Sequence, residues 1–269
     1  MSGPSVTLAE LESRAEVLKL ARLLKTPAER LDFLEQVAAG DIRALREQAT
    51  DVLFDANLGV LQRMAAASKL LPVSVLGRIA EKVFGPLLCA RLAGLIDVAR
   101  GVDVAGRLSP AFLADVAAEL DPRRASRIIA GIPADTVREV AHELVGRQDW
   151  ITIGRFVGHL PDGTVSATLD AVHDEALLRV AFVLDEKERI DHVVDLLPGT
   201  RFPGLAAAAA EHDLWPLTFD LLTHLSPAHQ QRLTDAVADL EPGVRAQAAE
   251  QAEALGLLRE PGPVREALS

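Results

Sequence analysis

Tyrosine is absent from this chain of 269 residues, aromatic residues make up only 4% of it, and cysteine occurs once, as Cys89. A single cysteine excludes an internal disulfide framework and fits a reducing cytosol, so we expect a cytoplasmic protein. No window alternates apolar and polar residues long enough to indicate a strand. A core rich in Leu, Ala and Val, with few aromatic or β-branched runs, favours helices.

Signals for export and membrane insertion are also missing. The first residues have neither the basic region nor the apolar region of a signal peptide. The longest apolar stretch, residues 70–96, is interrupted by four charged side chains and by Pro72 and Pro86. Because proline breaks a helix and a span needs an uninterrupted apolar stretch, we expect two buried helices here and no membrane span.

Common catalytic signatures are absent from the sequence. It contains no Gly-rich phosphate loop, no Gly-x-Ser-x-Gly elbow and no His-Glu-x-x-His metal motif. Carboxylates are numerous, yet none stands in an obviously apolar segment that would raise its pKa for acid–base work. We therefore predict a protein that is not an enzyme and has no cofactor.

Charge is distributed unevenly along the chain, whose formal net charge is −11. Residues 1–100 carry 13 Lys and Arg against 12 Asp and Glu, whereas residues 101–269 carry 15 against 27. A strongly acidic surface repels phosphate backbones, so we expect no nucleic-acid binding. It permits a cationic partner without requiring one.

Helix N-termini are the most specific local signals. Thr7–Glu10 and Thr26–Glu29 match the capping box, in which the Thr hydroxyl accepts the N3 amide and the Glu reaches back to the N-cap amide. Cap-then-proline pairs at 26–27, 109–110, 121–122 and 226–227 place proline at the first helical position. These marks predict an all-α fold, with helices over about 8–25, 27–39, 41–70 (with a break near 57–59), 74–84, 86–99, 110–119, 122–131, 134–147, 149–160, 164–184, 187–196, 203–212, 214–224, 227–239 and 243–257.

The second half of the chain contains an internal repeat. Four segments end in an apolar residue followed by a helix-ending turn, at positions separated by 28, 37 and 28 residues: Ile132, Leu160, Leu197 and Leu225. Trp150 and Trp215 each stand ten residues before such an end. A helix pair of this size cannot bury its apolar stripe alone, so neighbouring pairs must stack. We predict an α-solenoid of degenerate helical-hairpin repeats over 101–269, preceded by an N-terminal helical subdomain at 1–100 or continuous with it.

Residues 108–133, LSPAFLADVAAELDPRRASRIIAGIP, carry the clearest repeat. They resemble the superhelical N-terminal cytosolic domain of MgtE-type magnesium transporters, which repeats a leucine, a short spacer and an Ala/Leu helix ending in Leu-Pro. The resemblance spans about residues 105–161. This chain has neither the nucleotide-sensing domains nor the membrane domain of such transporters. The resemblance therefore implies the shape and a regulatory role, and does not imply transport.

The leading functional hypothesis is a scaffolding or regulatory protein that holds a protein partner, or a second copy of itself, on its helical-repeat surface. Trp150 and Trp215 have two interpretations. The one we favour is packing in the repeat core at each hairpin turn; in the other they are the candidate binding surface and line a concave face, because Trp often anchors interfaces. A second hypothesis is a small hydrophobic ligand in a pocket between the apolar helices at 70–99 and the Ala-rich segment at 206–210.

A metal-responsive regulator is the third hypothesis. Asp220 and His224 are four residues apart on one predicted helix and so share a face, an arrangement that ligates zinc when another helix adds a ligand. Three further candidates lie together on another helix: Asp191, His192 and Asp195. However, His159 and His224 occupy equivalent repeat positions, which favours a structural role near a helix C-terminus. We assign no metal site from the sequence.

Overall fold

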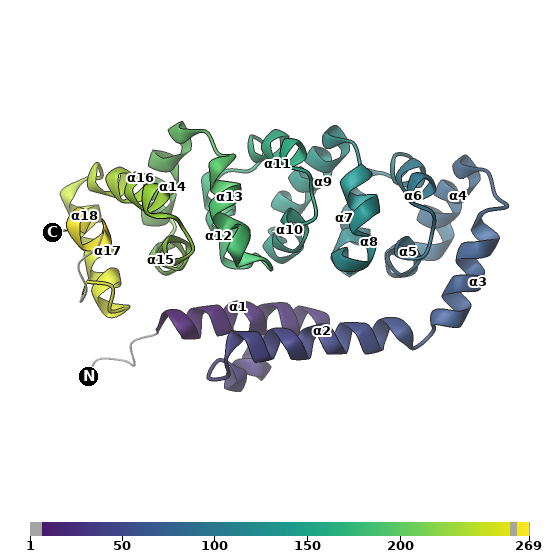
Figure 1. Ribbon diagram of the computed structural model, residues 1–269, viewed down its shortest axis with the longest axis horizontal. Coiled ribbons are helices and arrows are strands. Elements are labelled where there is room, and N and C mark those ends of the chain that lie inside the picture. Colours follow the sequence, from purple (N-terminus) through teal and green to yellow (C-terminus); the bar gives the residue numbers. More distant parts are fainter. Residues whose placement is uncertain (1–6, 259–262, 269) are drawn as a thin grey trace. The chain divides into compact units, whose positions relative to one another are not determined.

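The computed structural model describes residues 7–258 and 263–268, and every regular element within these ranges is helical (Figure 1). The all-α prediction is confirmed. The apolar stretch at 70–96 forms short helices rather than one long one. Across the described ranges, no helix is both long enough and apolar enough to cross a membrane.

The chain forms two compact units. Unit 1 comprises the described residues of 1–46 and 173–269, and unit 2 comprises residues 47–172. One boundary therefore falls inside α2 (Ala39–Asp55) and the other just before α12 (Asp174–Phe182). The predicted boundary near residue 100, between an N-terminal subdomain and the repeat region, stays a prediction.

Unit 1 joins the N-terminal helices to the C-terminal part of the chain. Within it α12 packs on α14 and α15, α14 on α16, α16 on α18, and α15 on both α17 and α1. Besides the start of α2 and α12 it contains α1 (Leu8–Leu23), η1 (Ala28–Leu34), η3 (Lys187–Arg189), α13 (Ile190–Asp195), η4 (Gly199–Arg201), α14 (Phe202–Glu211), α15 (Trp215–Thr223), α16 (Pro227–Ala238), α17 (Pro242–Ala254) and α18 (Pro263–Leu268).

In unit 2 several helices pack against the helix two further along the chain. Thus α4 packs on α6 and α6 on α8, while α5 packs on α7, α7 on α9 and α9 on α11. After the end of α2 the unit contains α3 (Leu58–Ser68), α4 (Val73–Ile79), the π-helix η2 (Ala80–Phe84), α5 (Gly85–Ala93), α6 (Val98–Ala105), α7 (Pro110–Glu119), α8 (Pro122–Gly131), α9 (Ala134–Gly146), α10 (Trp150–Val157) and α11 (Asp162–Leu169).

Three of the predicted helix caps are present. Thr7 forms the complete capping box, because its hydroxyl accepts from the Glu10 amide and the Glu10 carboxylate accepts from the Thr7 amide. The side chains of Ser109 and Asp121 cap α7 and α8 by accepting from backbone amides of the first turn. These bonds satisfy amides that a helix N-terminus leaves without an intrahelical partner.

The predicted capping box at Thr26 is wrong. The Thr26 amide donates to the Ala21 carbonyl at 3.0 Å, and Lys25 adopts a left-handed conformation with φ 52°. Thr26 therefore belongs to the turn that ends α1, and no side chain caps the following segment. The helix predicted at 27–39 is only the 3-10 helix η1.

Two further helix predictions need correction. The helix predicted at 164–184 is interrupted, because His173 caps α12 by accepting from the Ala176 amide at Nδ1. The helix predicted at 86–99 ends at Ala93, and Asp97 caps α6, which the sequence pattern did not predict. The apolar periodicity of the sequence runs on across both breaks, so it could not show them. The caps His173 and Asp97 mark where α12 and α6 begin.

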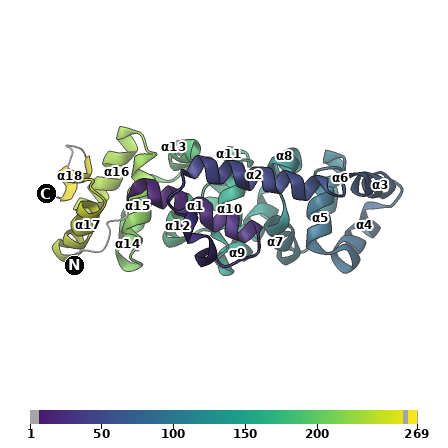
Figure 2. The same ribbon diagram turned by 90° about the horizontal axis from the view of Figure 1, so that it is seen from below.

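Each unit has its own apolar core. In unit 1, Val17 and Leu20 of α1 pack against Ile42 of α2 and against Leu31 and Leu34 of η1. Figure 2 shows α1 beside the first turns of α2. In unit 2 one core joins α5, α7, α8 and α10, through Ala90, Val116, Leu120, Ala125, Ile129 and Phe156.

Candidate functional site

The two candidate tryptophans lie in different environments. Trp215 begins α15 and is only 1% exposed, with its ring stacked on Phe219 at a centroid distance of 6.1 Å. Trp150 begins α10 and is partly exposed. Trp215 thus packs in the core of unit 1. A partner contact by either residue stays a prediction.

Large apolar side chains are exposed on the N-terminal helices. Phe33 is 70% exposed in unit 1, and Val52, Leu70 and Val83 are 71%, 85% and 73% exposed in unit 2. Within the described residues, all exposed large hydrophobic side chains lie between positions 24 and 87: Leu24, Phe33, Val37, Leu45, Val52, Leu53, Val60, Leu70, Val75, Val83 and Leu87. Single exposed apolar residues are ordinary, but their concentration in one stretch of the sequence makes this segment a candidate for protein contacts.

The exposure of these side chains was not evident from the sequence. The expectation that the helices of residues 70–96 are buried is correct only in part, because Val83 and Leu87 are exposed while Leu76, Ala80 and Leu92 are buried. A helix with apolar residues on more than one face gives no local sign of which face packs inward.

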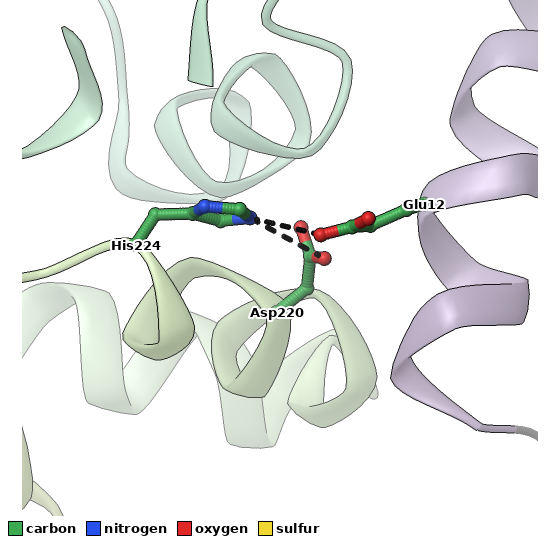
Figure 3. Close-up of side chains that lie close together, drawn as sticks. All are labelled: Glu12, Asp220 and His224. Atoms are coloured by element: carbon green, nitrogen blue, oxygen red, sulfur yellow. Dashed lines mark ion pairs between the residues drawn. The ribbon is translucent and has the colours of Figure 1, made fainter. Parts of the chain in front are cut away.

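Three side chains from α1 and α15 converge in unit 1 (Figure 3). Glu12 comes from α1, Asp220 from α15, and His224 directly follows α15. The Nε2 atom of His224 lies 3.5 Å from Glu12 Oε1 and 3.9 Å from Asp220 Oδ1. The pairing of Asp220 with His224 follows from their helical spacing. Glu12 could not be found that way, because only the packing of α1 on α15 brings it there.

Two atoms of this cluster are buried without a hydrogen-bond partner: Asp220 Oδ1 and His224 Nε2. Asp220 is 1% exposed, so its carboxylate has little access to water. A buried polar atom left unpaired costs about 1–3 kcal/mol. The cluster is therefore a place where a bound group would satisfy atoms that the protein itself leaves without partners.

Lys187 neutralises the other side of the Asp220 carboxylate. Its Nζ donates a hydrogen bond to Asp220 Oδ2, and both side chains are buried. Burial, followed by the positive charge of Lys187, lowers the pKa of His224 below its ordinary value. The imidazole is therefore neutral near pH 7, and one of its ring nitrogens carries a free lone pair.

A second histidine lies between two carboxylates. The Nδ1 and Nε2 atoms of His229 on α16 lie 2.6 Å from Asp191 Oδ1 and 3.1 Å from Asp195 Oδ1. The hydrogen bond from His229 lowers the pKa of Asp191. The sequence grouped these two aspartates with His192, whereas packing of the helices brings them to His229. These contacts connect α13 to α16. Because both ring nitrogens already face a carboxylate, His229 has no ring atom left for a ligand.

No family model, curated protein or solved structure matches the chain. The resemblance to MgtE-type domains stays a prediction. So do the lack of enzymatic activity and the alternative of a small hydrophobic ligand.

Proposed function

We propose that this chain is a non-catalytic binding protein that holds a protein partner through the apolar side chains exposed between residues 24 and 87. The observation that carries this proposal is their concentration there, with no comparable side chain exposed in the rest of the described residues. Full burial of one Val, Leu or Phe side chain contributes about 1.5–3 kcal/mol, so covering several of them supplies a substantial driving force for association.

The chemistry of the segment favours a partner with an apolar contact face. Residues 24–87 contain eight acidic and eight basic side chains, so the net charge of the chain resides elsewhere. The segment is thus neutral overall, and its exposed apolar side chains are the kind of group that the buried centres of protein interfaces contain. A second copy of the chain would bring another net charge of −11 close by, which favours a different protein over self-association.

We also propose that the helices of each unit stack as degenerate hairpins of an α-solenoid. In unit 2, the packing of α4, α5, α6, α7 and α9 each on the helix two further along supports this. A second support is a shared turn before the two tryptophan helices. Gln148 and Asp213 both have positive φ, 56° and 53°, and both stand two residues before a Trp. The next amide donates in each case to the carbonyl five residues earlier, at 2.9 and 2.8 Å.

The experiment compares charge insertions at apolar and polar exposed positions of the proposed segment, all of them in unit 2. Val52→Glu and Val60→Glu place a charge where an apolar contact is expected, and Gln62→Glu, on the same helix as Val60, adds the same charge at an exposed polar position. Capture of cross-linked partners from native lysate and light scattering of the purified chain measure association. We expect the two Val variants to bind the recovered partner about tenfold or more weakly, a loss of about 1.4 kcal/mol, with the control unchanged.

Two results would count against the proposal. One is equal recovery of the partner by all three variants. The other is a wild-type chain that stays monomeric and recovers no partner in a reproducible ratio in repeated experiments. Thermal melts of each variant verify folding, since exposed substitutions normally change stability by about 0.5 kcal/mol or less.

A further inference from the structure

We propose that Glu12, Asp220 and His224 form a binding site for a late first-row divalent metal ion, with zinc as the expected ion, and that this ion fastens α1 to α15. The inference does not depend on the proposed partner surface, because its three residues lie outside positions 24–87.

The spacing of the three ligand atoms suits a small ion. Zinc lies about 2.0–2.2 Å from nitrogen and oxygen ligands, which places the ligands of a tetrahedral site about 3.3–3.6 Å from one another. The His224 Nε2 atom lies 3.5 Å from Glu12 Oε1 and 3.9 Å from Asp220 Oδ1. All three atoms lie within 4.8 Å of one another. Small side-chain rotations therefore complete the geometry and leave a fourth position for water.

The burial of the cluster is a second and independent observation. Asp220 Oδ1 and His224 Nε2 are both buried and both lack a hydrogen-bond partner, and they face each other across the proposed ion position (Figure 3). With the imidazole proton on Nδ1, both atoms are acceptors, and two buried acceptors facing each other are unfavourable unless a cation lies between them. A cation satisfies both atoms.

The set of donor atoms selects the class of metal. Calcium takes six to eight oxygen ligands and magnesium an octahedral oxygen shell, whereas this site offers one imidazole nitrogen and two carboxylates. Imidazole with carboxylate suits zinc and its late first-row neighbours. The glutamate is partly exposed, so the ion has a path from solvent.

Lys187 determines how strongly the site binds. Its hydrogen bond to Asp220 Oδ2 fixes the carboxylate so that Oδ1 is left for the ion. The same ammonium repels a cation at the neighbouring oxygen. We therefore expect weaker binding than at thiolate zinc sites, with the bound ion readily removed by a chelator.

The test uses the full-length chain, stripped with EDTA and then titrated with zinc sulfate. Native mass spectrometry and calorimetry are expected to show saturable uptake of one ion per chain, and the melting temperature is expected to rise with zinc and fall back with EDTA. Glu12→Gln and His224→Gln should each weaken binding by at least about tenfold, since even partners of metal ligands contribute about 10–100-fold. Calcium or magnesium in excess should not displace the zinc.

The chain offers a matched control. His159 lies just after α10 as His224 lies just after α15, but Arg155 stands where the second helix has Asp220. His159→Gln should therefore leave zinc binding unchanged. Glu12→Gln provides a variant whose folding is not at risk, because the Glu12 side chain is 41% exposed. The proposal is overturned if the wild type takes up no zinc, if Glu12→Gln and His159→Gln bind zinc equally, or if calcium displaces the ion.

Discussion

Lys19 Nζ lies 2.9 Å from Asp185 Oδ1, a contact between residues 166 positions apart in sequence. Lys19 also lies 2.5 Å from Glu16 Oε1, and Arg46 donates to both Glu16 and Asp185. Burial lowers the pKa of Lys19, and the charges of Asp185 and Glu16 oppose that shift. This buried network connects α1 and α2 to Asp185 in the turn between α12 and η3, and so joins the two distant segments of unit 1.

Glu16 should contribute more to stability than Lys19. Glu16→Gln removes the charge of the buried carboxylate that Lys19, Arg43 and Arg46 all contact. Uncompensated buried charge costs about 3–5 kcal/mol, and we expect a loss near the lower end of this range. Lys19→Met leaves Glu16 paired with two guanidinium groups, so we expect less than half that loss. Urea unfolding of both variants measures the order, and the reverse order would contradict this account of the network.

Gly101 allows α6 and α8 to approach closely. A Cβ atom at this position would lie 2.4 Å from Ile128 Cδ1 and 3.0 Å from its Cγ1. We expect Gly101→Ala to lower the free energy of unfolding by about 1–3 kcal/mol through overpacking. Gly146→Ala is the control, because a Cβ atom there meets nothing within 4 Å and alanine favours the helix. Thermal melts compare the two, and equal changes would exclude the packing explanation.

Gln148 has φ 56° in the turn before α10. Left-handed backbone costs about 1–2 kcal/mol for a residue with a Cβ atom, and glycine avoids this cost but loses more chain entropy on folding. We expect Gln148→Gly to stabilise the protein by up to about 1 kcal/mol. Gln148→Val, with a branched Cβ, should destabilise it by more than about 1 kcal/mol. Denaturant midpoints of the two variants should lie on opposite sides of the wild type.

Burial raises the pKa of Cys89 to about 11. The folded state therefore keeps the thiol proton more firmly than the unfolded state, whose thiol titrates near its ordinary pKa of 9.0. The resulting stabilisation is fully present below pH 9 and is lost as the pH rises toward 11. Wild type should lose more stability than Cys89→Ala over this interval. Native Cys89 should also react with a disulfide reagent at pH 8 far more slowly than the urea-unfolded chain, and equal rates would contradict the raised pKa.

Most helix starts could be predicted because a cap is a local interaction. Thr7 with Glu10, Ser109 and Asp121 each form a bond within two or three residues, so neighbouring sequence determines it. Thr26 shows the limit of such patterns. Its sequence matches a capping box equally well, but its amide already ends α1. Thr26 could belong to a capping box or to the turn that ends α1, and its hydrogen bond to Ala21 places it in the turn.

The sequence by itself determined an all-helical chain, the position of most helices and the helical pairing of Asp220 with His224. It could not indicate that Glu12 would join them or that Asp191 and Asp195 would contact His229. Nor could it indicate that Trp215 would be buried while Val52 and Leu70 are exposed. Helix formation depends on residues three or four positions apart. Burial and convergence depend on which helices pack together, and in unit 1 these come from opposite ends of the chain.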